Sequence, residues 1–589
     1  MLVLVGLVVA ALALTGLGRA PFIDPPEGFH AEIAREMAAR GDWITPRLNG
    51  VRYFDKPPLP YWLMAASFAV AGPTPTAARV WGAVAVVGVA LVTAALGLML
   101  RGPRLALLAG LFVAANLGVF LYGRILKPDL PFVFFIWLGW LGIAIAWRAG
   151  PRPAIRGPNA APARAPDEKR RVFGLALFYA ALALAALTKD FLGAVGPMVA
   201  LAVTLWWTGE RARLRWFPWW GLLILGAVAA PWYLAVELQN RGFLWYTLVD
   251  NHVMNVMQQR AFPDEDVPLG ALEFLAVTIG AFLPWIVAVP VGIAQTLAQR
   301  PRGPIGKLWR LVTLWGVAVV VVFTISPFKL PHYALPAFPA FALLAARAWD
   351  AALAGPRGAR RVILPALAVC VMLAGVFLAM TTGVLKLGAD ELTSVDVATR
   401  NFSARGQSVS APSLEAWGSI MAAAAAIFGA AAVLLAVAAW RRAISVAVVA
   451  TVGAMLAFLP AAGVGMGIFA DVRSLQPVAN ALTARARPTD LVVHEGALEN
   501  SGSLLIALGR PVHVVNGLRS NLAYGATFAD SRDVFWDTPR LVREWSGRER
   551  RFLVSITEPD ASVVRWLPAD RVHLLARSTT HWLYSNLAD

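Results

Sequence analysis

The polar residues of the first loop are the part of the chain best suited to chemistry. Residues 20–62 read APFIDPPEGFHAEIAREMAARGDWITPRLNGVRYFDKPPLPYW and directly follow the first apolar span. This stretch holds carboxylates that can accept a proton and a lysine that can hold an anion. A simple connector needs neither group, so the loop indicates an enzyme working at a membrane surface. The polar residues in question are Asp24, Glu27, His30, Glu32, Arg47, Tyr53, Asp55 and Lys56.

The first part of this loop predicts a turn followed by a helix. Residues 24–28 read DPPEG, and the segment FHAEIAREMAARG after them places apolar residues four apart on one face. This spacing predicts an interfacial helix over residues 31–40 that lies on the membrane. Glu27 either caps that helix or serves chemistry, because an acid near a helix N-terminus offsets the helix dipole. Glu32 and Glu36 are expected to be solvated charges of the helix.

Two stiff, proline-bearing turns each carry a lysine. Residues 53–59 read YFDKPPL, and residues 326–333 read SPFKLPHY. Proline fixes φ and removes a backbone donor, so each turn holds its lysine, Lys56 or Lys329, in a rigid non-helical segment. A lysine offers a compact positive charge for a phosphate oxygen. The alternative for Lys56 is an ordinary lysine extending to the membrane interface.

Three further polar positions lie at the ends of predicted spans. Asp129 begins a span after a short loop, where it either complements the helix dipole or forms an ion pair. Lys189 and Asp190 occupy a tight turn between two spans, where charges are costly unless paired or hydrated, so a function is the default expectation. A lone histidine is more often structural, but His252 lies on a loop dense in polar groups.

Composition makes the chain a polytopic α-helical membrane protein. It is 58% hydrophobic and 15% charged, with a mean hydropathy of +0.63. The net charge of +17 does not indicate nucleic acid, because the basic residues lie in short loops that flank spans. Windows of apolar residues predict about thirteen spans. They lie near residues 2–19, 79–100, 103–122, 130–148, 172–187, 191–208, 215–236, 270–296, 308–325, 332–349, 361–382, 415–439 and 443–468.

The basic loops also predict the orientation and the domains. They alternate along the chain, so one side of the membrane, the cytoplasmic side, collects nearly all of them. Every loop that could carry chemistry then faces outward, including the first loop at residues 20–78. The membrane domain is expected at residues 1–468. Residues 469–589 contain short apolar strands separated by helical patterns, which predict a small outward α/β domain.

Several kinds of enzyme lose their support. The sequence has no HExxH, no paired CxxC, no phosphate loop and no dinucleotide fingerprint, which argues against a zinc protease, a redox enzyme and an ATPase. The single cysteine, Cys370, lies in an apolar run and is expected to be an inert buried thiol. No cofactor is firmly indicated. Two nearby carboxylates in the first loop have the ligand type of a divalent cation, and metal dependence stays open.

Together these segments resemble a known family. The run EIAREMAARGDWITPRLNGVRYFDKPPLPYW is similar to the first outer loop of the bacterial lipid A aminoarabinose transferases. FKLPHYALPAFPA, LTKDFLGAVGP and APWYLAVELQNRGFLWYTLVDNH resemble later family motifs, in the same order, within residues 20–350. These enzymes are C-type membrane glycosyltransferases, which also include the protein O-mannosyltransferases.

The resemblance implies a reaction and a set of site residues. A sugar would move from a polyprenyl-phosphate carrier to a lipid or other cell-envelope acceptor, at the periplasmic face of a bacterial inner membrane. The partners would be that donor, the acceptor and membrane lipids, with no nucleic acid. Asp129 would be a second loop carboxylate of the catalytic site. The donor phosphate or lipid would be held by Lys56, Lys329, Tyr333, His252, Tyr53 and Lys189.

The chain departs from the family pattern where the catalytic base is expected. The family reads Asp-Glu-x-Arg-Tyr-Ala-Glu-Ile, whereas this chain has Pro26 in place of the aspartate, keeps Glu27, and has Phe29-His30 in place of Arg-Tyr. Either Glu27 has become the base, which we favour, or Asp24 reaches the same point. A transporter or flippase, and a family member with a degenerate site, are the alternative functions.

Overall fold

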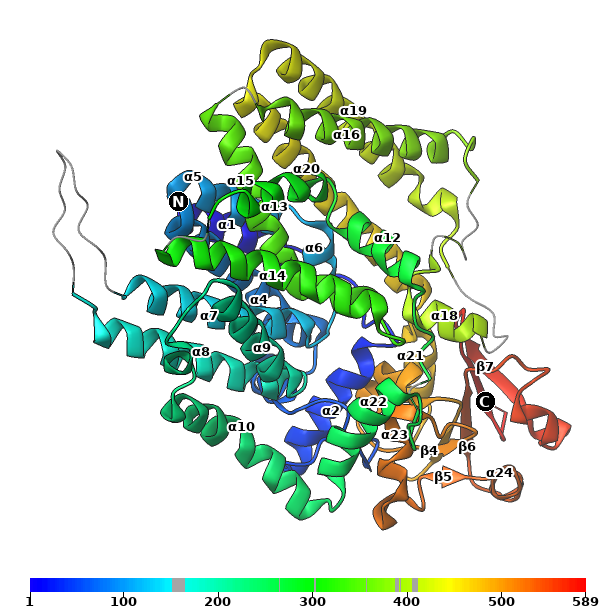
Figure 1. The fold of residues 1–589 in the computed structure, drawn as a ribbon. Coiled ribbons are helices and arrows are strands. Elements are labelled where there is room, and N and C mark those ends of the chain that lie inside the picture. The colour runs from blue at the N-terminus through cyan, green and yellow to red at the C-terminus, as the bar shows by residue number, and fades with distance from the viewer. Residues whose placement is uncertain are drawn as a thin grey trace, which may run out of the picture.

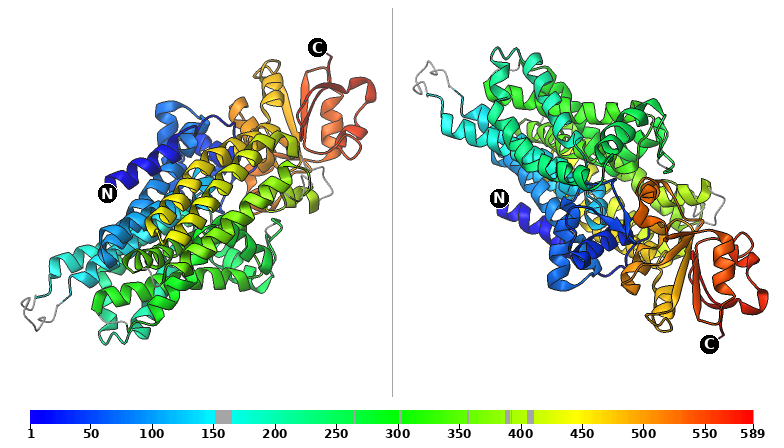
Figure 2. Two further views of the ribbon diagram at one scale, coloured as in Figure 1. Left: turned by 90° about the horizontal axis from the view of Figure 1, so that it is seen from above. Right: turned by 90° about the horizontal axis from the view of Figure 1, so that it is seen from below.

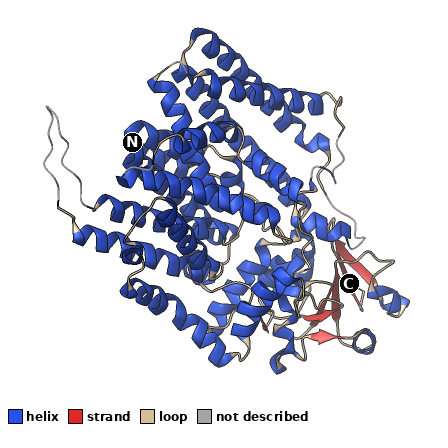
Figure 3. Cartoon of the chain, viewed as in Figure 1, coloured by secondary structure: helices blue, strands red, loops and turns tan. Residues whose placement is uncertain are grey.

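The chain folds into a bundle of long helices with a mixed α/β region at one end. The computed structural model describes residues 1–150, 165–263, 265–300, 303–355, 358–386, 391, 393–404 and 411–588. Figure 1 follows the chain from α1 (Leu2–Leu14) to the last strand, and Figure 3 shows that the strands gather beside the C-terminus. In Figure 2 this α/β region lies at the opposite end of the bundle from the end of α7 and the start of α8.

Nine helical segments in the described ranges are long and apolar enough to cross a membrane. Their apolar side chains face both neighbouring helices and the outside, as expected of a bundle that is surrounded by lipid. The helices are α4 (Pro75–Arg101), α7 (Asp129–Arg148), α8 (Glu168–Thr188), α10 (Trp219–Gln239), α14 (Gly303–Ile325), α15 (Phe338–Ala354), α16 (Arg360–Thr381), α19 (Gly418–Arg441) and α20 (Ile444–Val472).

Two further predicted spans are bent pairs of helices. The first pair, α5 (Pro103–Ala114) and α6 (Leu117–Arg124), bends by 54°. Asn116 ends one helix and starts the next, because its side chain accepts the N–H of Val119 at 2.8 Å. The second pair, α12 (Ala271–Ala281) and the segment 285–297 formed by η3 and α13 (Val289–Leu297), bends by 97°.

The predicted number of spans is not established. The described residues supply nine spans, or up to eleven if each bent pair counts as one. The other two predicted windows coincide with shorter apolar helices, α1 and α9 (Leu192–Trp207). A third short apolar helix, α3 (Leu59–Ala71), was not predicted at all. Each of the windows nevertheless falls on a helix, so the count of about thirteen stays a prediction.

Helices α7 and α8 show how the bundle packs so closely. At their crossing Gly142 and Gly174 face one another, and a Cβ added to either would lie 2.5 Å from the carbonyl oxygen of the other. Only glycine permits this approach, since any side chain would overlap the opposite backbone. The contact fixes the start of α7, which carries Asp129, relative to the turn that follows α8.

The first loop forms a buried helix and a small hairpin. Helix α2 (Glu27–Arg40) begins four residues earlier than expected and is buried along most of its length. Strands β1 (Arg47–Leu48) and β2 (Val51–Arg52) pair antiparallel after it. Glu32 and Glu36 are not solvated as expected: they are 2% and 4% exposed and pair with Arg35 and Arg40.

The α/β region contains a six-stranded sheet of order β5-β4-β3-β6-β8-β7. The first four of these strands are parallel, and the last two run antiparallel to their neighbours. The predicted apolar runs each became a strand. The strands are β3 (Leu491–Glu495), β4 (His513–Val515), β5 (Phe535–Trp536), β6 (Arg551–Ser555), β7 (His573–Arg577) and β8 (Trp582–Ser585), and the main helices are α21 (Gln476–Thr483), α22 (Gly502–Leu508) and α24 (Thr538–Trp545).

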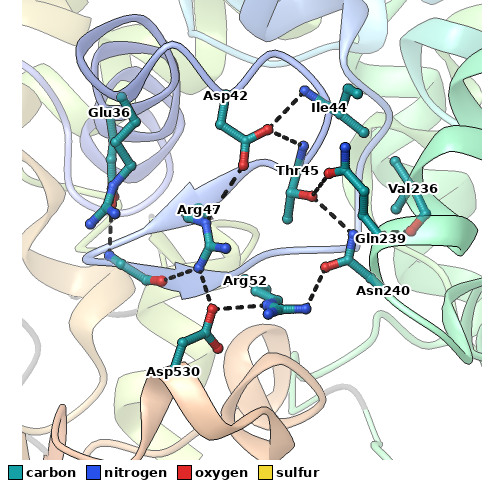
Figure 4. Close-up of polar contacts among 12 residues, drawn as sticks. Glu36, Asp42, Ile44, Thr45, Arg47, Arg52, Val236, Gln239, Asn240 and Asp530 are labelled. Carbon is teal, nitrogen blue, oxygen red and sulfur yellow. Dashed lines mark hydrogen bonds and ion pairs between the residues drawn. The ribbon is translucent and has the colours of Figure 1, made fainter.

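The first loop and the α/β region share one hydrophobic core. Phe29 and Ile33 of α2 belong to the same buried cluster as Leu504 of α22 and Phe552 of β6. In Figure 1, α2 lies beside α22. Figure 4 shows a second connection, in which Asp530 accepts from both Arg47 and Arg52 of the hairpin, at 2.9 and 3.0 Å. The α/β region therefore holds the first loop in place.

The hairpin is also held from the bundle side. Arg52 donates to Asn240 at 2.7 Å, and Asn240 donates in turn to Thr45 at 2.9 Å (Figure 4). Gln239, the last residue of α10, accepts from the hydroxyl of Thr45 at 3.2 Å. These bonds fix the position of the segment that leads into Lys56.

Candidate functional site

Asp129 is the centre of a charged site built from three distant segments. It is the first residue of α7 and only 4% exposed. Its Oδ1 accepts a hydrogen bond from Nζ of Lys189 at 2.6 Å, and Nε2 of His332 lies 3.8 Å from the same oxygen. Lys189 comes from the turn between α8 and α9, and His332 from η4 (Pro331–Ala337) before α15. The fold therefore joins two predicted residues with one that sequence reasoning missed.

Lys127 and Lys189 lie within electrostatic range of this carboxylate, and together with Lys56 we name them the lysine cluster. All three lie within electrostatic range of His332. Burial lowers the pKa of Lys127, and the charge of Asp129 offsets part of that effect. Lys189 is bonded to Asp129, whereas Lys56 and Lys127 line a neighbouring groove, and a pair of cations suits a phosphate group.

Lys56 and Lys127 of the lysine cluster line a small, mainly apolar groove. The groove runs between α3, α4 and the segment before α7, and its charged or polar members are His30, Lys56, Tyr61, Arg79 and Lys127. Its apolar wall is formed largely by Pro60, Leu63, Met64, Trp81 and Ile125. A groove with an apolar wall and lysines in its lining matches a ligand that has a hydrocarbon chain and a phosphate head.

Lys127 and His332 were not predicted as binding residues. Lys127 stands two residues before Asp129 in the segment LKPD, and His332 stands between Pro331 and Tyr333. Both lie in the segments that suggested Asp129 and Tyr333, so proximity in sequence to a charged turn was the signal available. Neither could be placed at the carboxylate before the helices were assembled.

Lys329 and Tyr333 lie in the same turn as His332. Lys329 is 6% exposed, and in the described part of the chain its ammonium forms no ion pair or hydrogen bond, while its carbonyl accepts the N–H of Leu269 at 3.0 Å. The ring of Tyr333 lies 4.9 Å from Nζ of Lys189. The structure thus brings Tyr333 to the lysine cluster and leaves the charge of Lys329 available.

Tyr53 and His252 lie behind these residues. Tyr53 is 2% exposed, and its hydroxyl is hydrogen-bonded to that of Tyr61. His252 packs its ring 4.5 Å from that of Phe191, which follows the Lys189 turn, and its Nδ1 bonds to the carbonyl of Thr247 at 2.6 Å. The side chains of Tyr53 and His252 therefore both contact other residues of the protein.

His30 faces the groove as a neutral imidazole. Its Nδ1 lies 2.9 Å from the hydroxyl of Tyr61, to which Tyr53 is bonded in turn. Burial, together with the charges of Lys56 and Lys127, lowers the pKa of His30 to about 3. The imidazole is therefore neutral near pH 7.

The carboxylate of Glu27 is occupied by structural hydrogen bonds. It is 0% exposed, and its oxygens accept from Arg79 at 2.5 and 2.8 Å. They also accept the backbone N–H groups of Ile23 and Leu126, each at 2.9 Å. These four bonds join the first loop to α4 and to the segment before α7. They leave Glu27 poorly placed to take a proton from a ligand.

Asp24 bonds to the α/β region. Its carboxylate accepts from the backbone N–H of Ser503 at 3.2 Å and also from the hydroxyl of that residue. Burial raises the pKa of Asp24 to about 7, although the bonds from Ser503 act in the opposite direction. Both carboxylates that were candidates for the catalytic base therefore hold the first loop against its neighbours.

Asp55 is a further carboxylate at the site. It precedes Lys56, and its Oδ1 accepts the hydroxyl proton of Tyr246 at 2.5 Å. Burial raises the pKa of Asp55, and Lys56 is the largest opposing influence. A carboxylate with a raised pKa beside a cation is a common feature of catalytic sites. Asp55 was noted in the sequence but was not among the predicted catalytic residues.

The described residues do not fit a bound metal ion. No group of three or more histidine, cysteine, aspartate or glutamate side chains gathers in the part of the chain that the structure describes. Asp24 and Glu27, the pair that raised the question, are bonded to Ser503 and Arg79. The residues that the structure describes therefore give no basis for a step that uses a metal ion.

The architecture defines the class of protein. The chain superposes on ArnT from Cupriavidus metallidurans bound to undecaprenyl phosphate with a TM-score of 0.78, covering 100% of this chain and 98% of that one at 21% identity. The apo state of that protein gives the same values. The predicted fold class, a polytopic α-helical membrane protein of the C-type glycosyltransferase fold with a small C-terminal α/β region, is thereby confirmed.

Sequence similarity then identifies particular relatives. Residues 24–247 match the family model "Dolichyl-phosphate-mannose-protein mannosyltransferase". The chain is 28% identical over 355 residues to the undecaprenyl phosphate-alpha-4-amino-4-deoxy-L-arabinose arabinosyl transferase of Shewanella sediminis, covering 59% of each protein. It is 30% identical over 334 residues to the protein of that name from Serratia proteamaculans, covering 55% of this chain and 54% of that one.

The chain therefore spans somewhat more than half the length of these relatives, 59% of the first and 54% of the second. The resemblance inferred from the first loop is confirmed: the chain is a C-type glycosyltransferase-like protein similar to the lipid A aminoarabinose transferases.

Proposed function

We propose that this protein is a glycosyltransferase that moves a sugar from a polyprenyl-phosphate carrier to a lipid acceptor. The presence of Lys56 and Lys127 in the lining of a mainly apolar groove carries the proposal. The groove supplies a wall for the polyprenyl chain, and the lysines supply charge for its phosphate. The names of the relatives favour undecaprenyl phosphate as carrier and 4-amino-4-deoxy-L-arabinose as sugar. The resemblance to the lipid A aminoarabinose transferases favours lipid A as acceptor.

The chemistry of the lysine cluster follows from the leaving group. When the bond from the sugar carbon to the phosphate oxygen breaks, the electron pair stays on the phosphate, and its negative charge rises. Lys56, Lys127 and Lys189 stabilise that charge more in the transition state than in the ground state. Lys329 and Tyr333, on the neighbouring turn, complete the surroundings of the donor. Tyr53 and His252 are the remaining residues that we place around the donor, and their side chains are held by other residues of the protein.

We assign the acceptor's proton to Asp55. Asp55 adjoins Lys56 in the chain, and burial raises its pKa, which suits a group that takes up a proton. Asp129 holds Lys189 by a 2.6 Å bond and so positions a phosphate-binding cation. Asp24 and Glu27 then serve the fold of the first loop rather than the proton transfer.

The distribution of basic residues among the loops indicates which side of the membrane the site faces. Arginine-rich loops on one side favour a cytoplasmic placement of that side. The lysine cluster, the first loop and the α/β region then face the periplasm of a bacterial inner membrane. A carrier-linked donor suits that compartment, since it arrives already activated.

The test is sugar transfer by the purified full-length protein. It would be incubated with undecaprenyl phosphate-linked 4-amino-4-deoxy-L-arabinose and lipid A, and the product followed by mass spectrometry. We expect a sugar-bearing lipid A with wild type and with Lys169→Ala, an exposed lysine far from the groove. The variant Lys56→Ala should lose it. Translocation of the carrier without sugar transfer would instead support a transporter or flippase.

A further inference from the structure

A second cationic pocket lies at the far end of the bundle from the lysine cluster. Arg79, at the groove, and Arg101, at this pocket, lie on the same helix α4, about 33 Å apart at 1.5 Å per residue. The pocket has a volume of about 230 Å³ and lies between the ends of α4 and α15 and the segment that joins α13 to α14. Its lining residues are Arg101, Thr296, Gln299, Arg300, Trp309 and Arg347, with Ile305 and Gly306 at its edge.

The buried member of this pocket is Arg347. Its side chain is 2% exposed, and its guanidinium lies 4.4 Å above the ring of Trp309. One terminal nitrogen, Nη2, donates to the carbonyl of Gln295 at 3.1 Å and to Oε1 of Gln299 at 2.7 Å. Its Nε has no hydrogen-bond partner among the described residues. A guanidinium with an unused donor therefore lines the cavity.

The surrounding charges do not neutralise Arg347. The nearest carboxylate on its own helix, Asp350, is 4% exposed and already contacts Arg104 and Arg101, at 3.0 and 3.5 Å. Arg310 donates only to backbone carbonyls in the described part of the chain. No carboxylate within the described ranges pairs with Arg347, and a buried cation without a counter-charge is costly. These neighbouring arginines therefore favour an anionic ligand that comes from outside the chain.

The rim of the pocket points to a lipid as the source of that anion. Ile305, which lines the cavity, is 45% exposed and offers apolar surface, and Leu297, the last residue of α13, is 47% exposed. Trp309, also in the lining, is 3% exposed and packs against the guanidinium of Arg347. Basic pockets between membrane helices on the cytoplasmic side are a known type of site for anionic lipid head groups.

We propose that this pocket binds a phosphate-bearing anion, supplied by the head group of an anionic membrane lipid. Arg347 and Arg101 contact the phosphate, and Trp309 fixes the guanidinium plane. The acyl chains lie along Ile305 and Leu297. The site is separate from the donor groove and holds the cytoplasmic ends of α4, α14 and α15 together.

The experiment compares two charge-matched variants of the full-length protein. Gln299→Glu places a carboxylate beside Arg347 and supplies internally the charge that the lipid would bring. Gln259→Glu makes the same change on an exposed loop at the other end of the bundle. Each protein is titrated with phosphatidylglycerol and, separately, phosphatidylcholine, and the lipid-bound fraction is counted by native mass spectrometry. Thermal unfolding in detergent is measured with and without inorganic phosphate.

We expect phosphatidylglycerol to bind wild type and Gln259→Glu alike, and Gln299→Glu about tenfold more weakly, as for the loss of roughly 1.4 kcal/mol. Phosphatidylcholine should bind all three proteins to the same extent. Equal phosphatidylglycerol binding by Gln299→Glu and Gln259→Glu, with no stabilisation of wild type by phosphate, would overturn the proposal. Stabilisation of wild type alone by inorganic phosphate, without a lipid preference, would support the anion site and assign it to a soluble phosphate.

Discussion

The turn at residues 24–30 and the lysine cluster use their charges in opposite ways. In the turn, Glu27 forms four hydrogen bonds and Asp24 is bonded to Ser503. At the lysine cluster, Lys189 is bonded to Asp129, whereas Lys56 and Lys127 line the groove. The turn has satisfied its polar groups within the protein, whereas the cluster presents two cations to a ligand. The capacity for chemistry therefore lies at the cluster, and the turn is also where the chain departs from the family pattern.

The largest expected effect concerns the turn. Glu27→Ala leaves the buried guanidinium of Arg79 without its carboxylate, which should destabilise the fold by about 3–5 kcal/mol. We expect little folded protein, measured by size-exclusion chromatography and thermal unfolding in detergent. Glu415→Ala, at an exposed glutamate, is the control. A stable Glu27→Ala protein that has lost only activity would restore Glu27 as the catalytic base.

The next effect concerns the lysine cluster. Lys127→Ala should lower the rate of sugar transfer about 10²–10³-fold, because one cation that stabilises the leaving phosphate is gone. The unfolding temperature should stay close to that of wild type, since burial of Lys127 opposes its charge. Transfer assays at saturating donor measure the effect, with Lys169→Ala alongside. Unchanged transfer by Lys127→Ala would separate this lysine from the site.

A smaller loss of activity is expected at Asp55, and it distinguishes the role of Asp55 from that of Asp129. Asp55→Asn removes the proposed proton acceptor and should lower the rate about 10²-fold. It should also abolish the rise of activity with pH that the raised pKa of Asp55 predicts. The measurement is the pH profile of the transfer rate from about pH 5 to 9. If Asp55→Asn keeps the wild-type profile while Asp129→Asn loses it, the proton-accepting role belongs to Asp129.

The smallest effect is a change in pH dependence at Asp24. The pKa of Asp24 is about 7 in the folded protein, above its ordinary value of 3.8, so the folded state binds more protons. Stability from this group is then full at low pH and is lost as pH rises toward about 7. Asp24→Asn keeps a neutral group there, and its unfolding temperature should vary less than that of wild type between about pH 5 and 8. Parallel curves would contradict the assignment.

The sequence predicted the fold class and much of the site from local patterns. Each apolar window fell on a helix, and each short apolar run after residue 469 became a strand. Asp129, Lys189 and Tyr333, chosen from separate turns, lie together. These successes share a cause: charged turns at the ends of spans are confined by the membrane to a narrow layer, where few neighbours are available.

The failures concern contacts between segments far apart in sequence. Helix α2 was expected on the membrane surface, but it is buried against α22, which no local pattern in either segment indicates. For the same reason the roles of Glu27 and Asp24 were uncertain, since their partners Arg79 and Ser503 lie elsewhere in the chain. His332 and Lys127 gained significance only when three turns met. Pairings of this kind are properties of the assembled bundle.

The contact between α2 and α22 also has a consequence for biosynthesis. Asp24 and Ser503 are 479 positions apart. At about 5–20 residues per second, the ribosome completes that interval in roughly half a minute to a minute and a half. During this time the first loop lacks the partner that covers it. A nascent or prematurely terminated chain would expose this apolar surface to chaperones and proteases, so only a fully translated molecule acquires a finished first loop.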